Sequence, residues 1–332
     1  MRRHWLGPIG LVTVLLALAA IPVVSQAQSK KWTLARTVDG QPDLQGVWSN
    51  NLATPLQRPP QWTGKATLTD AELDDLKRAA AEVTEGEGDA QFGDGLVLAA
   101  LARVKNAVSS DPTTGNYNQF WVTEREFEHR TSLITDPVDG RLPPYTPEAA
   151  QRRAAAAERV KLHPADSFAS RGLSERCLTW GVPRIQAAYN SHFQILQTRD
   201  YFVFYVEMAH DARIIPIDGR PHVSSAVRGW LGDSRGHWEG DTMVVETTNF
   251  SAKTNFQGAN ENLRLVERFT RVSSYVMNYE ATMTDPTTWT KPWTLMIPMR
   301  NTNELIYEYA CHEGNYSMAN MLAGARAEER KK

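Results

Sequence analysis

The densest cluster of chemically capable side chains in this sequence is the run from Glu207 to Arg213 (EMAHDAR). Histidine titrates near neutral pH, and an adjacent carboxylate can hold its ring in one orientation, so this pattern suits general acid–base catalysis. We therefore predict that His210 acts as acid or base and that Asp211 orients it. Arg213 would bind an anionic group or a developing negative charge. The alternative is a hairpin turn whose charges face water.

A second polar cluster covers Gly232 to Thr242 (GDSRGHWEGDT). Its carboxylates Glu239 and Asp241 are candidates for a second catalytic acid beside His210. The predicted substrate contacts, besides Arg213, are Arg235, Trp238 and Tyr205. The alternative is that these residues only form tight turns, which Gly and Asp favour, and do not belong to a site. The run also matches G-x-S-x-G, but that nucleophile motif requires a strand followed by a helix, and both flanks here have strand patterns.

A third cluster, Tyr307 to Tyr316 (YEYACHEGNY), contains a cysteine and the third candidate for a catalytic residue, His312. If residues 304–310 form a strand, alternation places Tyr307, Tyr309 and Cys311 on one face. We expect that face to be the core face, which leaves His312 at the end of the strand.

The sequence contains two cysteines, Cys177 and Cys311. In an oxidising compartment such a pair predicts a disulfide. The alternative pairs Cys311 with His312 as nucleophile and base. Neighbouring residues of a strand point to opposite faces, which disfavours that alternative.

The sequence has eight histidines but no H-x-H, H-E-x-x-H or C-x-x-C spacing, so we predict no metal site. It also lacks a glycine-rich phosphate loop and a G-x-G-x-x-G unit, so we predict no organic cofactor. The 36 basic and 38 acidic residues give a net charge of −2, which argues against a nucleic-acid partner. The predicted partner is therefore a small-molecule ligand or substrate.

The first 27 residues have the pattern of a secretory signal peptide. A basic start is followed by an uncharged apolar run from Gly10 to Val24, and then by small residues at a cleavage site after Ala27. An uncleaved membrane anchor is the alternative, but the run is short for a bilayer core. We expect a periplasmic or secreted protein that has no membrane segment after cleavage.

Helical patterns dominate before residue 165, and strand patterns dominate after it. Thr69 and Glu72 form a capping-box pattern ahead of a helix over 70–83, and Thr146 precedes a helix that runs to about Lys161. A further helix is expected at 96–108 and a closing helix at 317–329.

Short strands separated by Gly, Asp and Asn turns predict antiparallel β structure. The expected strands are 131–135, 193–198, 201–208, 213–218, 227–231, 236–239, 241–250, 263–272, 275–283, 293–300 and 304–310. A sheet with this many strands should curl or close into a barrel, because open edges invite aggregation. We expect a mainly β fold, in which an extended and helical segment of residues 28–165 wraps an antiparallel β domain of residues 166–332.

Six tryptophans could stack on a ring-bearing ligand or pack in the core and at its rim: Trp121, Trp180, Trp230, Trp238, Trp289 and Trp293. Together with the polar clusters they favour a secreted or periplasmic enzyme that performs cofactor-free acid–base chemistry on a small ring-bearing substrate. Its reaction would be of lyase, isomerase or hydrolase type. The alternative is a periplasmic carrier that binds such a molecule in an aromatic-lined cavity. A structural envelope protein is a third, weaker interpretation.

Several motifs together resemble a largely uncharacterised family of secreted bacterial proteins. They are PDLQGVW at 42–48, RTSLITDPVDGR at 130–141, ERCLTWG at 175–181, GDSRGHWEGDTMVVETTNF at 232–250, VERFTR at 266–271, DPTTWTKPWT at 285–294 and YEYACHEGNYSM at 307–318. They extend over nearly all of the chain after residue 27, and the G-D-S-R-G-x-W-E-G-D-T run is specific. The resemblance implies one family-wide fold but no reaction, because no established catalytic residues come with it.

Overall fold

The computed structural model of the protein describes residues 32–86, 88–108, 118–185, 187–254, 256–313 and 315–331. The predicted signal peptide, residues 1–27, lies outside the described residues. Contacts within the chain make Thr33–Lys332 one compact unit. Across the described residues, no helix is both long enough and apolar enough to span a membrane.

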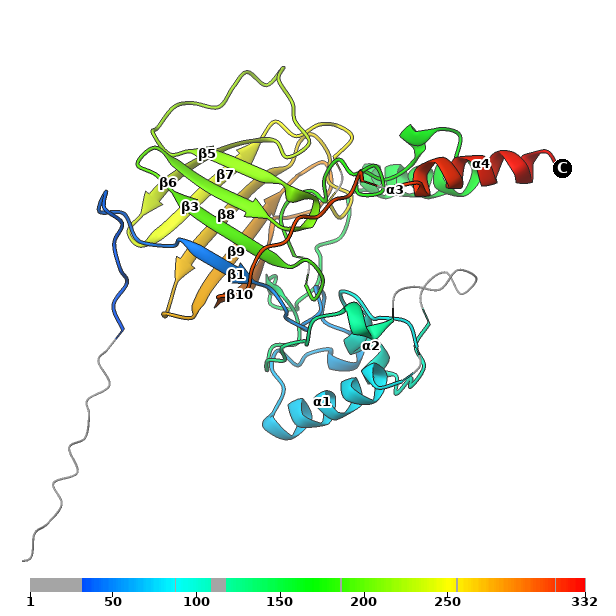
Figure 1. The fold of residues 1–332 in the computed structure, drawn as a ribbon, viewed down its shortest axis with the longest axis horizontal. Coiled ribbons are helices and arrows are strands. Elements are labelled where there is room, and N and C mark those ends of the chain that lie inside the picture. Colours follow the sequence, from blue (N-terminus) through cyan, green and yellow to red (C-terminus); the bar gives the residue numbers. More distant parts are fainter. Residues whose placement is uncertain are drawn as a thin grey trace, which may run out of the picture. The chain divides into compact units, whose positions relative to one another are not determined.

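A ten-stranded antiparallel sheet forms most of the structure (Figure 1). Along the sheet the strand order is β5-β4-β3-β1-β10-β9-β8-β7-β6, and β2 pairs with β10 outside this path. The strands are β1 Gly46–Ser49, β2 Ile134–Asp136, β3 His192–Gln197, β4 Tyr201–Val206, β5 Ala212–Pro216, β6 Asp233–Glu239, β7 Thr242–Thr248, β8 Arg264–Arg271, β9 Val276–Thr284 and β10 Trp293–Thr302.

The sheet curls until its two edge strands, β5 and β6, lie close together. Gly236 of β6 fits against this edge because it has no side chain: a Cβ there would lie 2.8 Å from Cγ2 of Ile217. No ladder of hydrogen bonds joins β5 to β6 in the described residues, so the sheet is not closed. The prediction of a mainly β, curled antiparallel sheet is therefore confirmed.

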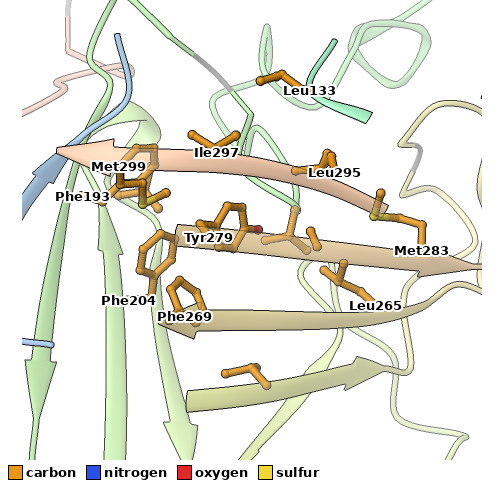
Figure 2. Close-up of a cluster of buried hydrophobic side chains, with 14 of the residues drawn as sticks. Leu133, Phe193, Phe204, Leu265, Phe269, Tyr279, Met283, Leu295, Ile297 and Met299 are labelled. Atoms are coloured by element: carbon orange, nitrogen blue, oxygen red, sulfur yellow. The ribbon is translucent and has the colours of Figure 1, made fainter. Parts of the chain in front are cut away.

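One face of the sheet forms the main core. Along β9 and β10 every second residue is buried, as the two-residue period of a strand requires. Figure 2 shows the inward side chains gathered between the strands, among them Phe193, Phe204, Phe269, Tyr279 and Ile297. Burying each large apolar side chain is worth about 1.5–3 kcal/mol, so this face supplies the main driving force for the fold.

Within the described residues, four α-helices accompany the sheet: α1 Asp70–Thr84, α2 Gly95–Leu101, α3 Pro147–Leu162 and α4 Ser317–Glu329. Four single 3-10 turns are η1 Pro60–Trp62, η2 Gln119–Trp121, η3 Phe168–Ser170 and η4 Met208–His210. The predicted capping box is present, because the Thr69 side chain accepts from Glu72 N and the Glu72 carboxylate accepts from Thr69 N. Helices α1 and α2 lie side by side (Figure 1), and residues of both contribute to a second, smaller apolar core.

Three predicted elements differ from the structure. Helix α2 ends at Leu101 rather than 108, because Arg103 has a φ of 54°, which a helix does not tolerate. Residues 227–231 form one isolated bridge instead of a strand. Residues 304–310 are not a strand: their backbone bonds side chains instead, with Tyr307 N donating to Glu207 Oε1 and Tyr309 O contacting His210 Nδ1. The prediction that Tyr307 is a core residue is wrong, since it is 66 % exposed.

Candidate functional site

The most ligand-like feature of the structure is a cavity of about 510 Å³, which we call the Arg125 cavity. Pockets for small molecules are commonly 300–1,000 Å³ in volume, mostly apolar, with a few placed polar groups. The lining residues are Asn50, Leu52, Thr54, Leu56, Phe92, Gly93, Asp94, Arg125, Leu133, Trp180, Ile185, Ala187, Tyr189 and Tyr309. This set fits that description, with aliphatic and aromatic walls and two charged residues, Asp94 and Arg125.

Backbone pairing outside the sheet builds one wall of the cavity. Residues 51–53, which follow β1, run beside residues 124–126. Ala53 N donates to Glu126 O at 2.7 Å, and Glu126 N donates to Asn51 O at 2.8 Å. Glu126 turns outward to Arg300, at 2.8 Å, while the intervening Arg125 is buried. The alternation of a strand-like pair therefore directs Arg125 inward.

The Arg125 guanidinium is only partly satisfied. Its Nη2 donates to Leu52 O at 2.7 Å and to Gly93 O at 3.2 Å. Its Nε and Nη1 are buried and have no hydrogen-bond partner among the described residues. Arg125 is only 8 % exposed, and burial lowers its pKa to about 10. A buried donor without a partner costs about 1–3 kcal/mol, and a ligand with an acceptor group would recover that cost.

Asp94 is the second polar group of the cavity. Its Oδ1 accepts from Leu56 N at 3.0 Å, and it forms no ion pair with any described residue. Burial raises the pKa of Asp94, although the Leu56 hydrogen bond and the charge of Arg125 oppose that shift. A carboxyl with a raised pKa beside a buried cation, in a cavity, is a pattern typical of functional sites.

Neither residue of the predicted catalytic pair His210–Asp211 is among the residues that line the cavity. Asp211 accepts from Thr179 Oγ1 at 2.7 Å and forms an ion pair with Arg184. Thr179 and Arg184 belong to the loop that supplies Trp180 and other cavity residues. The Asp211 carboxylate therefore holds that loop against the end of β4.

His210 is exposed, and its Nδ1 contacts Tyr309 O at 3.0 Å. Tyr309 belongs to the segment 303–313, which we call the strap. The strap continues from β10, and its Tyr309 lines the Arg125 cavity. A disulfide joins Cys311 of the strap to Cys177, which confirms the predicted pairing and removes the nucleophile alternative.

A second histidine also attaches the strap. His192 Nδ1 lies 3.1 Å from Glu207 Oε2, and its Nε2 lies 2.7 Å from Glu304 Oε2 on the strap. Tyr307 N donates to Glu207 Oε1 at 3.1 Å. The hydrogen bond to Glu207 is the main cause that raises the pKa of His192, because both ring nitrogens can then donate to carboxylates.

The other predicted catalytic residues are not brought to His210. Arg213, three residues after His210, donates to Ser234 Oγ at the start of β6, at 3.0 Å. Glu239 ends β6, five residues further, which is about 16 Å along a strand. There it contacts His237 and Arg268, and Asp241 pairs with Arg36.

His312 is a strap residue that lines another cavity, of about 300 Å³, together with Phe168 and Arg176. The structure therefore separates the five predicted catalytic residues: His210 and Asp211 follow β4, Glu239 and Asp241 lie at the β6–β7 turn, and His312 lies near the end of the strap. Their individual catalytic roles stay predictions, but the fold does not bring all five residues together in one site.

The predicted substrate contacts also have structural partners. Arg213 is buried and paired with Glu267, whereas Arg235 is paired with Asp233 and donates to Pro221 O. Trp238 is half-buried against the main core, and Tyr205 lies on the outward face of β4. Of the six tryptophans, Trp289 and Trp293 are core residues, and Trp180 lines the Arg125 cavity.

No group of three or more His, Cys, Asp or Glu side chains in the described part of the chain is arranged to hold a metal ion. The comparisons with known proteins do not identify a family or a function for the chain. No family model, curated protein or solved structure matches the chain. The resemblance to secreted bacterial proteins therefore stays a prediction.

Sequence patterns did not point to Arg125 or Asp94. Arg125 lies in TEREFEHR (123–130), whose alternating charges are typical of a solvated edge, and Asp94 lies in the turn-like FGDG (92–95). Only the pairing of residues 51–53 with 124–126 reveals which charge faces inward. The aromatic residues Trp180, Tyr189 and Tyr309 come from two further segments.

Proposed function

We propose that this protein binds a small, ring-bearing and largely apolar molecule in the Arg125 cavity. The observation that carries the proposal is the combination of an apolar, aromatic-walled cavity with a buried guanidinium that has two unpartnered nitrogens. Apolar walls provide non-directional affinity, and the polar pair fixes orientation. The bound molecule would place an acceptor oxygen toward Arg125 and a donor toward Asp94.

The proposal includes the compartment in which the protein works. The Cys177–Cys311 disulfide fits a protein of an oxidising compartment. We therefore infer a periplasmic or secreted binding protein, which takes up its ligand outside the cytoplasm.

A second candidate is the acid–base enzyme, with its chemistry moved from His210 to Asp94. The observation that favours it is the raised pKa of Asp94 beside Arg125 in the same cavity. Asp94 would move a proton on the bound molecule, and Arg125 would stabilise the negative charge that develops on its oxygen. Lyase, isomerase and hydrolase reactions all need such a proton transfer and such stabilisation of negative charge.

The experiment is a thermal-shift and calorimetric screen of the disulfide-bonded protein against phenolics, terpenoids and sugars. A ligand at 100 times its dissociation constant should add about 2.7 kcal/mol of stability. Ala187→Phe fills the cavity and should abolish binding, whereas the matched control Ala212→Phe, on the exposed side of β5, should not. Binding that survives in a folded Ala187→Phe variant would overturn the proposal.

Turnover separates the two candidates. A carrier leaves each ligand unchanged over hours, and Asp94→Asn alters only its affinity. An enzyme converts one ligand, and Asp94→Asn lowers kcat by at least 100-fold, the usual contribution of a positioned acid or base. Product analysis by mass spectrometry distinguishes these results.

A further inference from the structure

A second cavity, of about 780 Å³, shares Trp180 with the Arg125 cavity. We call it the basic cavity. Its other walls come from residues 168–181 and from Lys253 and Thr254. The charged side chains that line it are Arg171, Arg176 and Lys253, and no carboxylate is among its lining residues in the described chain.

Ion pairing leaves this positive charge largely uncompensated. Arg171 is neutralised by Glu175, at 2.6 Å, and donates to Pro164 O at 3.0 Å. Neither Arg176 nor Lys253 forms an ion pair with any residue that the structure describes. The excess is therefore two positive charges at one cavity of a chain whose net charge is −2.

Arg176 is oriented by a contact with an aromatic ring. Its guanidinium carbon lies 5.2 Å from the centre of the Phe168 ring, which is within the range of a cation–π contact. Such a contact leaves the N–H donors of the guanidinium available, and arginine binds carboxylate and similar oxyanions well. An anion would thus meet a cation that has already been oriented.

We propose that the basic cavity binds the anionic group of the ligand whose ring occupies the Arg125 cavity, so that the ligand is an amphiphilic organic acid. This inference rests on the proposed function. The shared residue Trp180, which is 43 % exposed, would contact the ring-to-acid connection of such a molecule. The same cations suit a free inorganic oxyanion, and the experiment separates the two sources.

The test uses two fluorescent probes with similar rings on the intact, disulfide-bonded protein. One is the anionic 8-anilinonaphthalene-1-sulfonate, and the other is the neutral N-phenyl-1-naphthylamine. The double variant Arg176→Gln/Lys253→Gln should weaken the anionic probe about 5- to 10-fold, since exposed and half-buried ion pairs are individually modest. The neutral probe should change less than 2-fold.

The matched control Arg199→Gln/Lys291→Gln removes the same charge from exposed turns, at β3–β4 and β9–β10. The affinity of this control variant for each probe should stay within 2-fold of that of the original protein. Raising sodium chloride from about 0.02 to 0.5 M should weaken the anionic probe alone, because salt screens exposed charges. The Ala187→Phe variant should lose both probes.

Each other outcome identifies what failed. Equal losses of both probes, or no loss of the anionic probe, overturn this inference and leave the proposed function standing. If sodium sulfate displaces the anionic probe from the original protein but the ring adds no affinity over sulfate, the site is for a free oxyanion and the inference also fails. If neither probe nor any screened ligand binds the original protein, the proposed function itself is overturned.

Discussion

Two buried arginines of this protein have opposite environments. Arg213 of β5 makes a two-bond contact with Glu267, at 2.9 and 2.6 Å, and also donates to Thr247 Oγ1 at 3.1 Å. The Tyr279 hydroxyl, visible in Figure 2, donates to the same Glu267 at 2.7 Å. Arg125 instead reaches two backbone carbonyls, and two of its nitrogens have no partner in the described chain.

The pKa values of the two arginines express this difference. Burial lowers the pKa of both, but Glu267 more than compensates at Arg213, where the pKa is raised. At Arg125 the charge of Asp94 offsets burial only in part, and the pKa is about 10. Among the described residues, Arg213 lacks a partner only at Nε and is neutralised by Glu267, whereas Arg125 lacks partners at both Nε and Nη1 and has no carboxylate bonded to it. A buried charge beside a bonded carboxylate supports the fold around it, and one with two unused donors can accept a ligand. Arg213 therefore belongs to the core, and Arg125 to a site.

The largest expected effect on stability comes from breaking the ion pair between Arg213 and Glu267. Glu267→Leu should lower the free energy of unfolding by about 3–5 kcal/mol, because Arg213 is left as an uncompensated buried charge. The double variant Arg213→Leu/Glu267→Leu should recover most of that loss. Urea unfolding of the three proteins measures both values. A single variant that loses less than 1 kcal/mol would show that Arg213 is not confined as described.

Removal of the disulfide comes next. Cys177→Ser/Cys311→Ser should cost about 2–4 kcal/mol, because the bond joins residues 134 apart in sequence. Ligand affinity should also fall, since the strap carries Tyr309 into the Arg125 cavity. Calorimetry on the oxidised and the variant protein tests this. Unchanged affinity in the folded variant would show that the strap does not shape the cavity.

The attachment of the strap should depend on pH. The pKa of His192 is raised above 6.5, so its contribution is complete below pH 6.5 and is lost as pH rises through the raised value. Burial alone would raise the pKa of Glu207, but its hydrogen bonds with His192 and Tyr307 N lower it below 4.5. Its contribution is therefore present above pH 4.5 and is lost as pH falls through the lowered value.

We thus expect stability to fall by about 1 kcal/mol between pH 6 and pH 9, the net contribution of one typical intramolecular hydrogen bond. His192→Gln should flatten that part of the profile, and His237→Gln, at an exposed position on β6, should not. Thermal unfolding across this pH range provides the profile. An unchanged slope in His192→Gln would contradict the assignment.

The smallest expected effect on stability is at the unpaired arginine. Arg125→Met should change the free energy of unfolding by less than about 1 kcal/mol, because the loss of two carbonyl contacts is offset by removal of two unpartnered donors. Ligand affinity should nevertheless fall at least 10-fold. A loss of stability like that of Glu267→Leu would place Arg125 with Arg213 as a structural residue.

Local patterns predicted much of the fold. The capping box at Thr69, the proline after Thr146 and the alternation in β9 and β10 each determine an element through neighbouring residues alone. The strand expected at 304–310 did not form because its backbone groups bond to the side chains of Glu207 and His210, which are about 100 residues earlier and invisible to a local pattern. The curled sheet follows from strand number, whereas the order of strands does not.

The candidate site depended even more on distant contacts. His210 and Asp211 were singled out by their composition, and they do matter, but as attachments of the strap and of the Trp180 loop. Asp94 and Arg125 come from unremarkable charged segments, which meet only through pairing around residue 52. Composition can show where polar groups are dense, but not which of them will be buried without a partner.

The short strand β1 has one more consequence, which concerns the order of folding. Four residues, Gly46–Ser49, join the sheet half β5-β4-β3 to the half β10-β9-β8-β7-β6 along the path of the sheet. Val47 pairs with Gln194 on one side and with Thr302 on the other. Pairings so distant in sequence form late and slowly. During synthesis the sheet cannot be completed until residue 302 has left the ribosome. The chain therefore remains incompletely folded for most of that time. An incompletely folded polypeptide is one that can be threaded across a membrane.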